Sequence, residues 1–596
     1  MPASAVASIV AAPGGSFLLE TRNPAEIFTP EDLNEEQRQI AATAARFARE
    51  EIVPAIAAIE SKEPGAMAAL LRKAAELGFT SVDIPEEFGG MNMDKTSSLL
   101  IADHISSLAS FSTAFGAHTG IATLPLVWYG TPELQARYLP RLATCEIIGA
   151  YALSESTSGS DAMNIRTRAT LSPDGEHYIL NGEKHWITNC GIAGVYTVFA
   201  KIDGEKFSAF VVERGTPGLT VGAEEHKLGI HGSSTCPLLL VDCKIPKSNL
   251  LGEIGKGHHI AFNVLNVGRL KLGVACIGGA RHALGEMIRY AKQRNAFGKS
   301  IAEFGLIQQK ISSSAAQIYA AESMAYRTVG MIDARLATPG ENPARDAQKS
   351  FEEYAVECSI LKVYGSEMIS HVTDELVATM GGYGFVEDYP AARLYRDARI
   401  NRIFEGTNEI NRMIVTGWLM KRAMAGKLAL LPAIKKVMDE VMAPPSFDGA
   451  GETGSVLARE TAVLASVKKI TLFAAGVASQ RFITGLEEQQ EIMADLANMI
   501  SQIYAFESAL LRALKLTSAG RSQASVAGAM TGLLAEGSMD LAETAARRIL
   551  ASCAEGDALH TQLAILRRLT RYTPANATAL SRSVARSCID VEKYPL

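Results

Sequence analysis

The sequence predicts a mostly α-helical protein of the α+β class, with one small antiparallel β domain in its middle. Apolar residues recur at helical spacing in the first and last parts of the chain, and short β-rich runs separated by turn signals lie between them. A segment rich in proline, glycine and serine separates the last two helical regions. The expected divisions are an N-terminal helical domain (29–148), a β domain (149–256), a helical domain (257–427), a linker (428–454) and a C-terminal helical domain (455–596).

The N-terminal domain is expected to begin as a helix at Thr29–Asp32, where a capping residue precedes proline and two acids. Ile40, Ala44 and Phe47 then continue an apolar face at helical spacing. The run Ile84–Gly90 contains a proline and two glycines, so it is expected to interrupt the helices as a loop.

Turn sequences in the middle of the chain predict hairpins. Pro173–Gly175 and Asp203-Gly204 are turns of the hairpin type between β-rich runs. Asn181-Gly182 is a further hairpin signal, so the residues on either side of it are expected to form a strand pair. The predicted strands include the runs 177–180, 195–200 and 208–212.

The second half of the chain is predicted to be helical again. Leu272–Arg294 has the pattern of one long helix, and its small residues suit close packing against a neighbouring helix. Thr338–Ala347 is expected to hold a loop to which we assign no function, and 444–455 is expected to be a linker. The sequence has no Rossmann or P-loop glycine motif.

Composition narrows the possible functions. The net charge is −6, from 58 basic and 64 acidic residues, so no basic field attracts nucleic acid. The eight cysteines are scattered without zinc spacing, which predicts no metal site and fits buried thiols in a reducing cytoplasm. The first residues lack a basic region, so neither a signal nor a transit peptide is expected. No stretch is expected to reach the apolar length of a membrane span.

Glu405 is the most informative residue. Ile403 and Phe404 precede it, and Gly406 breaks the helical pattern and lets a ligand approach the backbone. Thr407 then has the character of a helix N-cap. A carboxylate on such a loop is partly desolvated, which raises its pKa toward the range of a general base. From these residues alone, the alternative is a helix-terminal glutamate that faces solvent.

Five separated blocks in this α–β–α order resemble the acyl-CoA dehydrogenase family over residues 30–425. The blocks are 151–161, 181–189, 263–269, 294–299 and 380–385, and they precede the Ile-Phe-Glu-Gly-Thr run that contains Glu405. The tail beyond 425 resembles the extra helical domain of the very-long-chain branch. The resemblance implies a four-helix bundle within 257–427, FAD as cofactor and a homo-oligomer, most simply a dimer. By comparison with typical members of that family, the loop at 338–347 is expected to be longer.

The resemblance implies roles for individual residues of this chain, each at the position that matches the family's motif. Ser154 stands where the family usually has threonine, Ala296 stands where a threonine is frequent, and Ala378 replaces a usual glutamine. Arg294 and the glycines at 381 and 382 would reach the FAD of a neighbouring subunit. The implied FAD-binding residues are Tyr151, Leu153, Ser154, Gly159, Ser160, Trp186, Ile187, Thr188, Arg294, Phe297, Gly381, Gly382, Thr407, Asn408 and Glu409, and the implied substrate-binding residues are Ser160, Asn266, Arg269, Phe404 and Gly406.

The resemblance also implies the reaction, which is α,β-dehydrogenation of a fatty acyl-CoA of long or very long chain. Glu405 would remove the α-proton while its own N–H and a ribityl hydroxyl of FAD hold the thioester carbonyl. The β-hydrogen would leave as hydride to flavin N5, giving a trans-2-enoyl-CoA, and an electron-transfer flavoprotein would accept the electrons. A few relatives place their base near position 268, but Gly268 stands there, so Glu405 is the one candidate.

Other readings stay open at this point. An oxidase of the same fold would pass electrons to oxygen, and a non-enzymatic flavoprotein would act as an assembly factor. Branched, aromatic or dicarboxylic acyl groups are also possible substrates. The charges of Tyr395–Arg399 are expected to form a salt-bridge cluster that supports the catalytic loop. Lys427–Lys436 is expected to be a docking helix or, alternatively, a patch for peripheral membrane contact.

Overall fold

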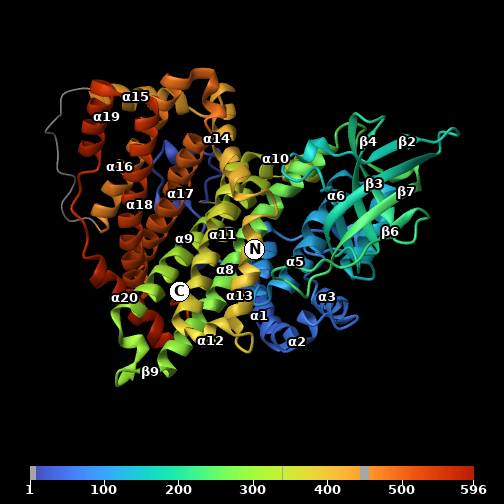
Figure 1. The fold of residues 1–596 in the computed structure, drawn as a ribbon, viewed down its shortest axis with the longest axis horizontal. Coiled ribbons are helices and arrows are strands. Elements are labelled where there is room, and N and C mark those ends of the chain that lie inside the picture. Colours follow the sequence, from blue (N-terminus) through green and yellow to red (C-terminus); the bar gives the residue numbers. More distant parts are fainter. Residues whose placement is uncertain (1–8, 339, 443–455) are drawn as a thin grey trace.

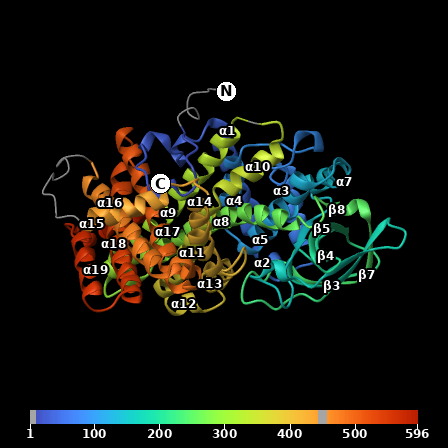
Figure 2. The same ribbon diagram turned by 90° about the horizontal axis from the view of Figure 1, so that it is seen from above.

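A bundle of long helices lies between the β domain on one side and the C-terminal helices on the other (Figure 1; Figure 2). The computed structural model describes residues 9–338, 340–442 and 456–596. The predicted order of helical, β, helical and further helical domains is confirmed.

The N-terminal domain begins later than predicted. Thr29 caps only a 3-10 turn, Pro30–Asp32, and the chain is extended at Leu33 before α1 starts. The reason is a second cap, because the Asn34 side chain accepts the backbone N–H of Gln37. The helices of this domain are α1 (Glu35–Phe47), α2 (Val53–Glu60), α3 (Ala66–Glu76), α4 (Lys95–His104), α5 (Ala109–Gly116), α6 (Leu124–Tyr129) and α7 (Pro132–Ala143), with π-helical turns at Ala48–Ile52 and Ala117–Ala122.

The β domain is one sheet with the strand order β6-β7-β3-β2-β4-β5-β8, and β1 pairs with β4. Most pairs are antiparallel as predicted, but β4 runs parallel to both β1 and β2. The predicted turns at Pro173–Gly175 and Asp203-Gly204 lie between strands. The strands are β1 (Gly149–Ala152), β2 (Arg168–Leu171), β3 (His177–Thr188), β4 (Val195–Ile202), β5 (Lys206–Glu213), β6 (Leu219–Val221), β7 (Thr235–Pro246) and β8 (Leu250–Leu251).

The predicted hairpin at Asn181-Gly182 is wrong, because β3 continues through both residues. The register against β7 shifts between Leu180 and Gly182, so the pair forms an irregularity inside one strand. A Cβ at Gly182 would lie 2.4 Å from Thr167 Oγ1, which requires glycine there. The Asn181 amide is tied to the adjacent strand, where its Oδ1 accepts the N–H of Asp242 at 2.8 Å.

The central bundle is formed by long helices in close contact. α8 is longer than predicted and packs on α9 and α11, and α11 also packs on α14. A Cβ at Gly273 of α8 would lie 2.6 Å from Leu361 of α11, which confirms the role of the small residues. The elements are α8 (Gly257–Gln293), β9 (Asn295–Ala296), β10 (Lys299–Ser300), α9 (Gly305–Leu336), α10 (Pro343–Glu353), α11 (Ala355–Met380), α12 (Gly382–Phe385), α13 (Pro390–Arg399) and α14 (Asn408–Met424).

Two predicted irregular segments contain helix. In the stretch 338–347, the described residues 338 and 340–342 form no helix, and the Asn342 side chain caps α10, which begins at Pro343. The predicted linker 428–454 contains α15 (Leu430–Met442), and its remainder from 443 lies outside the described residues. Leu430, Ile434, Val437 and Val441 of α15 are buried and the helix packs on α16, as expected for a docking helix, while Leu431 and Met442 are exposed. The C-terminal domain contains α16 (Ala458–Phe482), α17 (Gln490–Ser518), α18 (Ala524–Cys553), α19 (Gly556–Leu569) and α20 (Ala577–Val591).

Two helical segments, Gly257–Gln293 and Ala458–Glu488, are long and apolar enough to cross a membrane, which corrects the expectation that none would be. The most apolar stretch of each is mostly buried inside the fold, 67% and 61% respectively, which is the pattern of core helices. All eight cysteines are buried and unpaired, which confirms the prediction of buried thiols.

Candidate active site

Glu405 lies on a short turn between the 3-10 turn Ile400–Arg402 and α14. Its backbone is left-handed, with φ +58°, and Gly406 follows with φ +81°. Such a conformation is unusual for a non-glycine residue and marks a turn that its surroundings hold in place. Thr407 is the N-cap of α14 and accepts the N–H of Ile410, as predicted.

Side chains from three helices hold the carbonyl groups of this turn. Arg269 of α8 donates from Nε to the Glu405 carbonyl at 3.3 Å. Lys362 of α11 donates from Nζ to the Gly406 carbonyl at 2.7 Å. Asn411 of α14 donates to the carbonyls of Gly406 at 2.8 Å and Thr407 at 3.0 Å. Among the described residues, by contrast, the N–H of Glu405 donates to no protein acceptor. The turn is therefore fixed through its carbonyls and presents a free N–H.

The Glu405 carboxyl is the candidate base. The residue is half-buried as a whole, but its Oε2 is buried and has no hydrogen-bond partner among the described residues. Burial raises the pKa of Glu405 to about 7, against the opposing effect of the Arg269 and Lys362 cations. The buried tip of the carboxyl confirms the prediction of a desolvated carboxylate and excludes the alternative of a glutamate that faces solvent.

Gly268 makes room for this carboxyl. A Cβ at position 268 would lie 2.6 Å from Glu405 Oε2 and 2.8 Å from its carboxyl carbon. The side chain of Glu405 thus rests on bare helix backbone of α8, and any larger residue at 268 must displace it.

We expect Gly268→Ala to lower kcat about 100-fold, because a shift of the order of 1 Å in a catalytic group has effects of that size. The substitution lies within a helix and favours helix formation, so the protein should keep its fold and FAD. Steady-state kinetics with an acyl-CoA checks this, and a variant with unchanged kcat would contradict the placement of the Glu405 carboxyl.

A largely apolar cavity leads away from the carboxyl of Glu405. It encloses about 1080 Å³, counting its opening to solvent. One face of α8 lines it over three turns, from Gly268 to Gly279, a rise of about 16 Å. Residues of α4, α5, α11 and α13 and the π-helical turn at 117–122 line the rest. The cavity therefore has the shape and polarity of a channel for an extended hydrocarbon chain.

The loop that follows β1 is anchored to β3 next to the cavity. The N–H of His185 donates to the Ser154 carbonyl at 2.9 Å. Lys184 is fully buried and pairs with Glu155 at 2.7 Å, and it also donates to the Leu153 carbonyl at 3.1 Å. Because charged side chains are rarely buried unless paired, this ion pair is a structural anchor of the loop.

Trp186 and Thr188 lie on the far end of β3. Trp186 has a left-handed backbone, with φ +56°, and its side chain is 57% exposed. Thr188 lines the cavity together with Glu405. Tyr151 lies near Glu405, and its hydroxyl is buried without a hydrogen-bond partner among the described residues. An exposed indole and an unpaired hydroxyl close to Thr188 and Glu405 fit a flat aromatic cofactor such as the flavin of FAD.

One chain does not bring all the predicted FAD-binding residues together. The β9–β10 hairpin with Arg294 and Phe297, and α12 beside Gly381, lie at the lower end of the helical part, away from the β domain (Figure 1). Phe297 is 95% exposed. This separation agrees with the prediction that these residues serve the FAD of a neighbouring subunit, although the contacts themselves stay predictions.

The other predicted site residues are placed as follows. Asn266 and Arg269 are buried and bonded to each other at 2.8 Å. Asn408 is buried and bonded to Lys362, Ser366 and Glu367, so its side chain is used within the chain. The remaining positions have these exposures: Ile187 is buried, Phe404, Gly406 and Thr407 are half-buried, and Gly159, Ser160, Gly382 and Glu409 are exposed.

The expected salt-bridge cluster of Tyr395–Arg399 is present in α13. Arg396 pairs with Glu387, and Arg393 lies 3.6 Å from Asp397. Asp397 also accepts the N–H of Ile230 at 2.5 Å. The contact of Asp397 with Ile230 fastens α13, which leads into the Glu405 turn, to the β domain.

Sequence reasoning missed Lys362, Asn411 and the Lys184–Glu155 pair. Lys362 stands alone in the apolar run Ser359–Val363, and a lone cation in an apolar helix signals a buried partner. Burial lowers its pKa to about 8. Lys184 stands between Glu183 and His185, so its neighbours in the sequence give no such signal. Asn411 carries no signal in the sequence.

The fold and the site define a flavin-dependent oxidoreductase of α–β–α domain order, and comparisons with known proteins give the family. Family models described as acyl-CoA dehydrogenase N-terminal, middle and C-terminal domains match residues 34–146, 150–243 and 255–420. A further acyl-CoA dehydrogenase C-terminal domain matches 466–568. The chain therefore belongs to the acyl-CoA dehydrogenase family, and its cofactor is FAD.

Two proteins resemble the chain over almost its whole length. A probable acyl-CoA dehydrogenase of Bacillus subtilis is 44% identical and covers 98% of both chains. A crystal structure of an acyl-CoA dehydrogenase complexed with FAD from Bacillus anthracis has a TM-score of 0.95 at 44% identity, and covers 98% of this chain and all of its own. The very long-chain specific acyl-CoA dehydrogenase of Macaca fascicularis is 38% identical over 57% of this chain and 51% of its own.

Proposed function

We propose that this acyl-CoA dehydrogenase oxidises long-chain fatty acyl-CoA to trans-2-enoyl-CoA, with Glu405 as the base. The observation that carries the proposal is the position of the Glu405 carboxyl at one end of an apolar cavity that follows α8 for three turns. A hydrocarbon tail would fill the cavity, and its thioester end would lie at Glu405.

The chain's own residues supply binding and proton transfer. The free N–H of Glu405 would donate to the thioester carbonyl and stabilise the negative charge that develops there as the α-proton leaves. Glu405 would accept the α-proton from a carbon held beside its carboxyl. The N–H and the carboxyl of Glu405 are kept in place because Arg269, Lys362 and Asn411 hold the turn. When bound, FAD supplies the acceptor for the β-hydrogen as hydride, and an electron-transfer flavoprotein is the proposed recipient of the electrons.

The pH dependence of the reaction follows from the raised pKa of Glu405. The base must be ionised to accept a proton, so below its pKa of about 7 the rate of flavin reduction should fall about tenfold per pH unit. Above that pKa the rate should level off. Anaerobic mixing of enzyme and acyl-CoA at graded pH measures this, and a rate that stays constant from pH 5 to 7 contradicts a base of raised pKa.

Anaerobic incubation of the FAD-loaded protein with acyl-CoAs of graded chain length tests the proposal. We expect long-chain thioesters to bleach the flavin faster than butyryl-CoA. Absence of bleaching with every thioester would contradict dehydrogenation and favour the assembly-factor alternative. Rapid reoxidation of the bleached flavin by oxygen, with release of hydrogen peroxide, would favour an oxidase over transfer to an electron-transfer flavoprotein.

We also propose a homodimer in the cytoplasm. Apolar side chains are exposed in the two blocks that the family resemblance places toward a second subunit, Phe297 in 294–299 and Phe385 in 380–385. Large apolar side chains so exposed are unfavourable in water unless a partner covers them. Peripheral membrane contact through α15 has less support, because Leu430, Ile434 and Val437 of that helix are buried inside the protein.

A further inference from the structure

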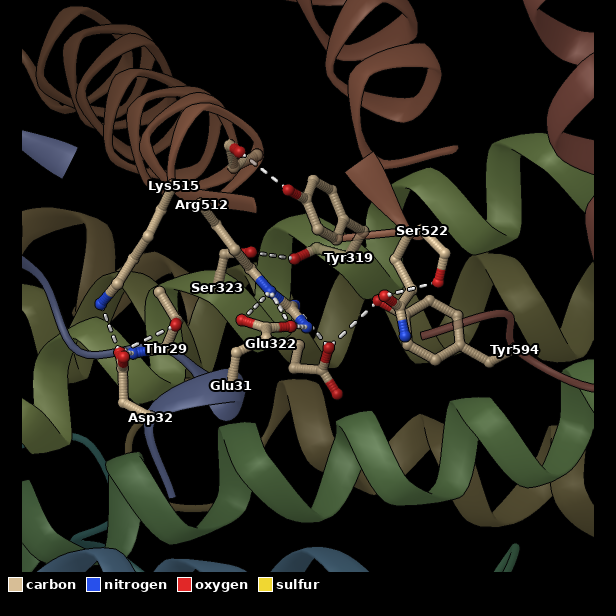
Figure 3. Close-up of polar contacts among 12 residues, drawn as sticks. Thr29, Glu31, Asp32, Tyr319, Glu322, Ser323, Arg512, Lys515, Ser522 and Tyr594 are labelled. Atoms are coloured by element: carbon tan, nitrogen blue, oxygen red, sulfur yellow. Dashed lines mark hydrogen bonds and ion pairs between the residues drawn. The ribbon is translucent and has the colours of Figure 1, made fainter. Parts of the chain in front are cut away.

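A chain of buried charges connects the C-terminal domain to the catalytic bundle. Arg512 of α17 is buried and donates from Nη1 to Glu322 of α9 at 2.6 Å (Figure 3). Arg281 of α8 donates to the other oxygen of Glu322, also at 2.6 Å. Arg281 in turn pairs with Asp103, in the last turn of α4. The order across four helices is therefore Arg512, Glu322, Arg281, Asp103.

Further contacts fix the outer end of this charge chain. Glu31, from the N-terminal segment, accepts from Arg512 Nη2 at 2.6 Å. Tyr594, near the end of the chain, donates its hydroxyl to Glu322 at 3.1 Å (Figure 3). Lys515, one turn beyond Arg512, pairs with Asp32 at 2.5 Å. Arg512 and Glu322 are thus held by the C-terminal domain and the N-terminal segment together.

The inner end of the charge chain lies beside the cavity, at the end of the lined stretch of α8 that is remote from Glu405. Ile105 and Ser106, just after Asp103, line the cavity, as does Gly279, two residues before Arg281. A Cβ at Gly279 would lie 2.9 Å from Ile369 and 3.5 Å from the Ser106 carbonyl, so little space remains there. The junction of α4 and α8 therefore forms part of the cavity wall at this end.

The Arg281–Asp103 ion pair joins α8 to α4 at a position where the helix dipole of α4 is unfavourable for the charge of Asp103. Asp103 is buried in the last turn of α4, where the helix dipole disfavours negative charge, and its Oδ1 has no hydrogen-bond partner among the described residues. The guanidinium of Arg281 neutralises Asp103 from α8. Glu322 accepts a hydrogen bond from the Arg281 guanidinium and so orients it. Arg281 and Arg512 together neutralise the charge of Glu322. Loss of Arg512 leaves Arg281 free to move toward Glu322 and away from Asp103.

We propose that the C-terminal domain sets the depth of the acyl cavity through this charge chain, and that Arg512 and Glu322 are positioning residues for chain-length preference. The inference rests on the proposed oxidation of long-chain acyl-CoA. It assigns to the additional domain a role in substrate selection, although none of its residues lines the cavity.

Arg512→Met in the full-length, FAD-loaded protein tests this inference, with Arg327→Met as the matched control. Arg327 of α9 also pairs with a buried acid of α17, Glu507, at 2.9 Å, but contacts neither Arg281 nor Asp103. In each variant the buried acid keeps one cation, Arg281 for Glu322 and Lys468 for Glu507. Arg512→Met also removes the cation that pairs with Glu31, so both variants should lose stability and Arg512→Met should lose more.

The measured quantity is the ratio of kcat/KM for palmitoyl-CoA to that for octanoyl-CoA. We expect Arg512→Met to change this ratio about tenfold, while Arg327→Met lowers the Tm and leaves the ratio unchanged. Tyr594→Phe, which removes one hydroxyl from Glu322 and preserves the ion pairs, should change the ratio in the same direction by a smaller factor. If Arg512→Met does not fold, the ratio measured in Tyr594→Phe tests the inference instead.

Other outcomes overturn the inference. If the ratio is unchanged in Arg512→Met, the charge chain only stabilises the fold. If Arg512→Met does not fold, an unchanged ratio in Tyr594→Phe leads to the same conclusion. An equal change in Arg327→Met shows a general effect of the domain interface. If the wild-type protein oxidises no acyl-CoA at all, the proposed function fails and the inference fails with it. If the wild type is active and the ratios do not move, only the inference fails.

Discussion

Replacing Glu405 by glutamine is expected to lower the rate of flavin reduction by about 10²–10⁴-fold, the usual contribution of a positioned general base. Glutamine has the same shape and fits over Gly268, but its amide does not accept the α-proton. The variant should bind FAD normally, because the Glu405 side chain makes no hydrogen bond that holds the site together. Stopped-flow measurement of flavin bleaching by a long-chain acyl-CoA checks the rate, and bleaching at the wild-type rate would contradict the assignment.

The same substitution should stabilise the protein at alkaline pH. The pKa of Glu405 is about 7 in the folded state and near 4.5 when the carboxyl is exposed, so the unfolded state loses this proton first. The free energy of unfolding therefore falls as pH rises from about 4.5 to 7, and the full loss persists at pH 8. Glu405→Gln removes the titration and should have a higher Tm at pH 8 than the wild type. A lower Tm of Glu405→Gln at pH 8 would mean that the folded protein stabilises the ionised carboxylate, which contradicts a raised pKa.

Lys184→Met is expected to destabilise the β domain by about 3–5 kcal/mol, the usual effect of removing one partner of a buried ion pair. Burial acts to raise the pKa of Glu155, but the Lys184 ammonium and the donors of Arg166 and Thr167 lower it. Without Lys184 the buried carboxylate keeps only those neutral donors. The loop at Leu153–Glu155 also loses a hydrogen bond, so we expect FAD to bind more weakly.

Denaturant unfolding of the FAD-free protein and titration with FAD measure the two effects separately. Lys206→Met is a matched control, because Lys206 pairs with Asp203 on the exposed end of the same sheet and should contribute less than about 1 kcal/mol. Equal stability of the two variants would contradict the view that the Lys184–Glu155 pair anchors the loop.

The helical and β domains and Glu405 could be predicted because their signals are local. Helical spacing, hairpin turns at Pro173–Gly175 and Asp203-Gly204, and the glycine and cap after Glu405 each depend on neighbouring residues. The wrong hairpin at Asn181-Gly182 shows the limit of such signals. The turn-forming pair lies inside a strand, where Thr167, just before β2, leaves no room for a side chain at Gly182.

The supports of the site could not be predicted, since they depend on contacts between distant segments. Lys362, Arg269 and Asn411 meet at the Glu405 turn only when three helices pack together. The expectation that no stretch would reach the apolar length of a membrane span was wrong, and other helices cover much of the apolar surface of α8. The family resemblance, rather than periodicity, linked Glu405 to a flavin.

Proton transfer to Glu405 is the central claim, and exchange of the substrate α-hydrogen tests it most directly. The FAD-loaded wild type and Glu405→Gln are incubated anaerobically with palmitoyl-CoA in deuterium oxide, and the recovered thioester is examined by mass spectrometry. The wild type should place deuterium at the α-carbon, and Glu405→Gln should not do so above the rate without enzyme. Exchange by Glu405→Gln at the wild-type rate would show that another group removes the proton.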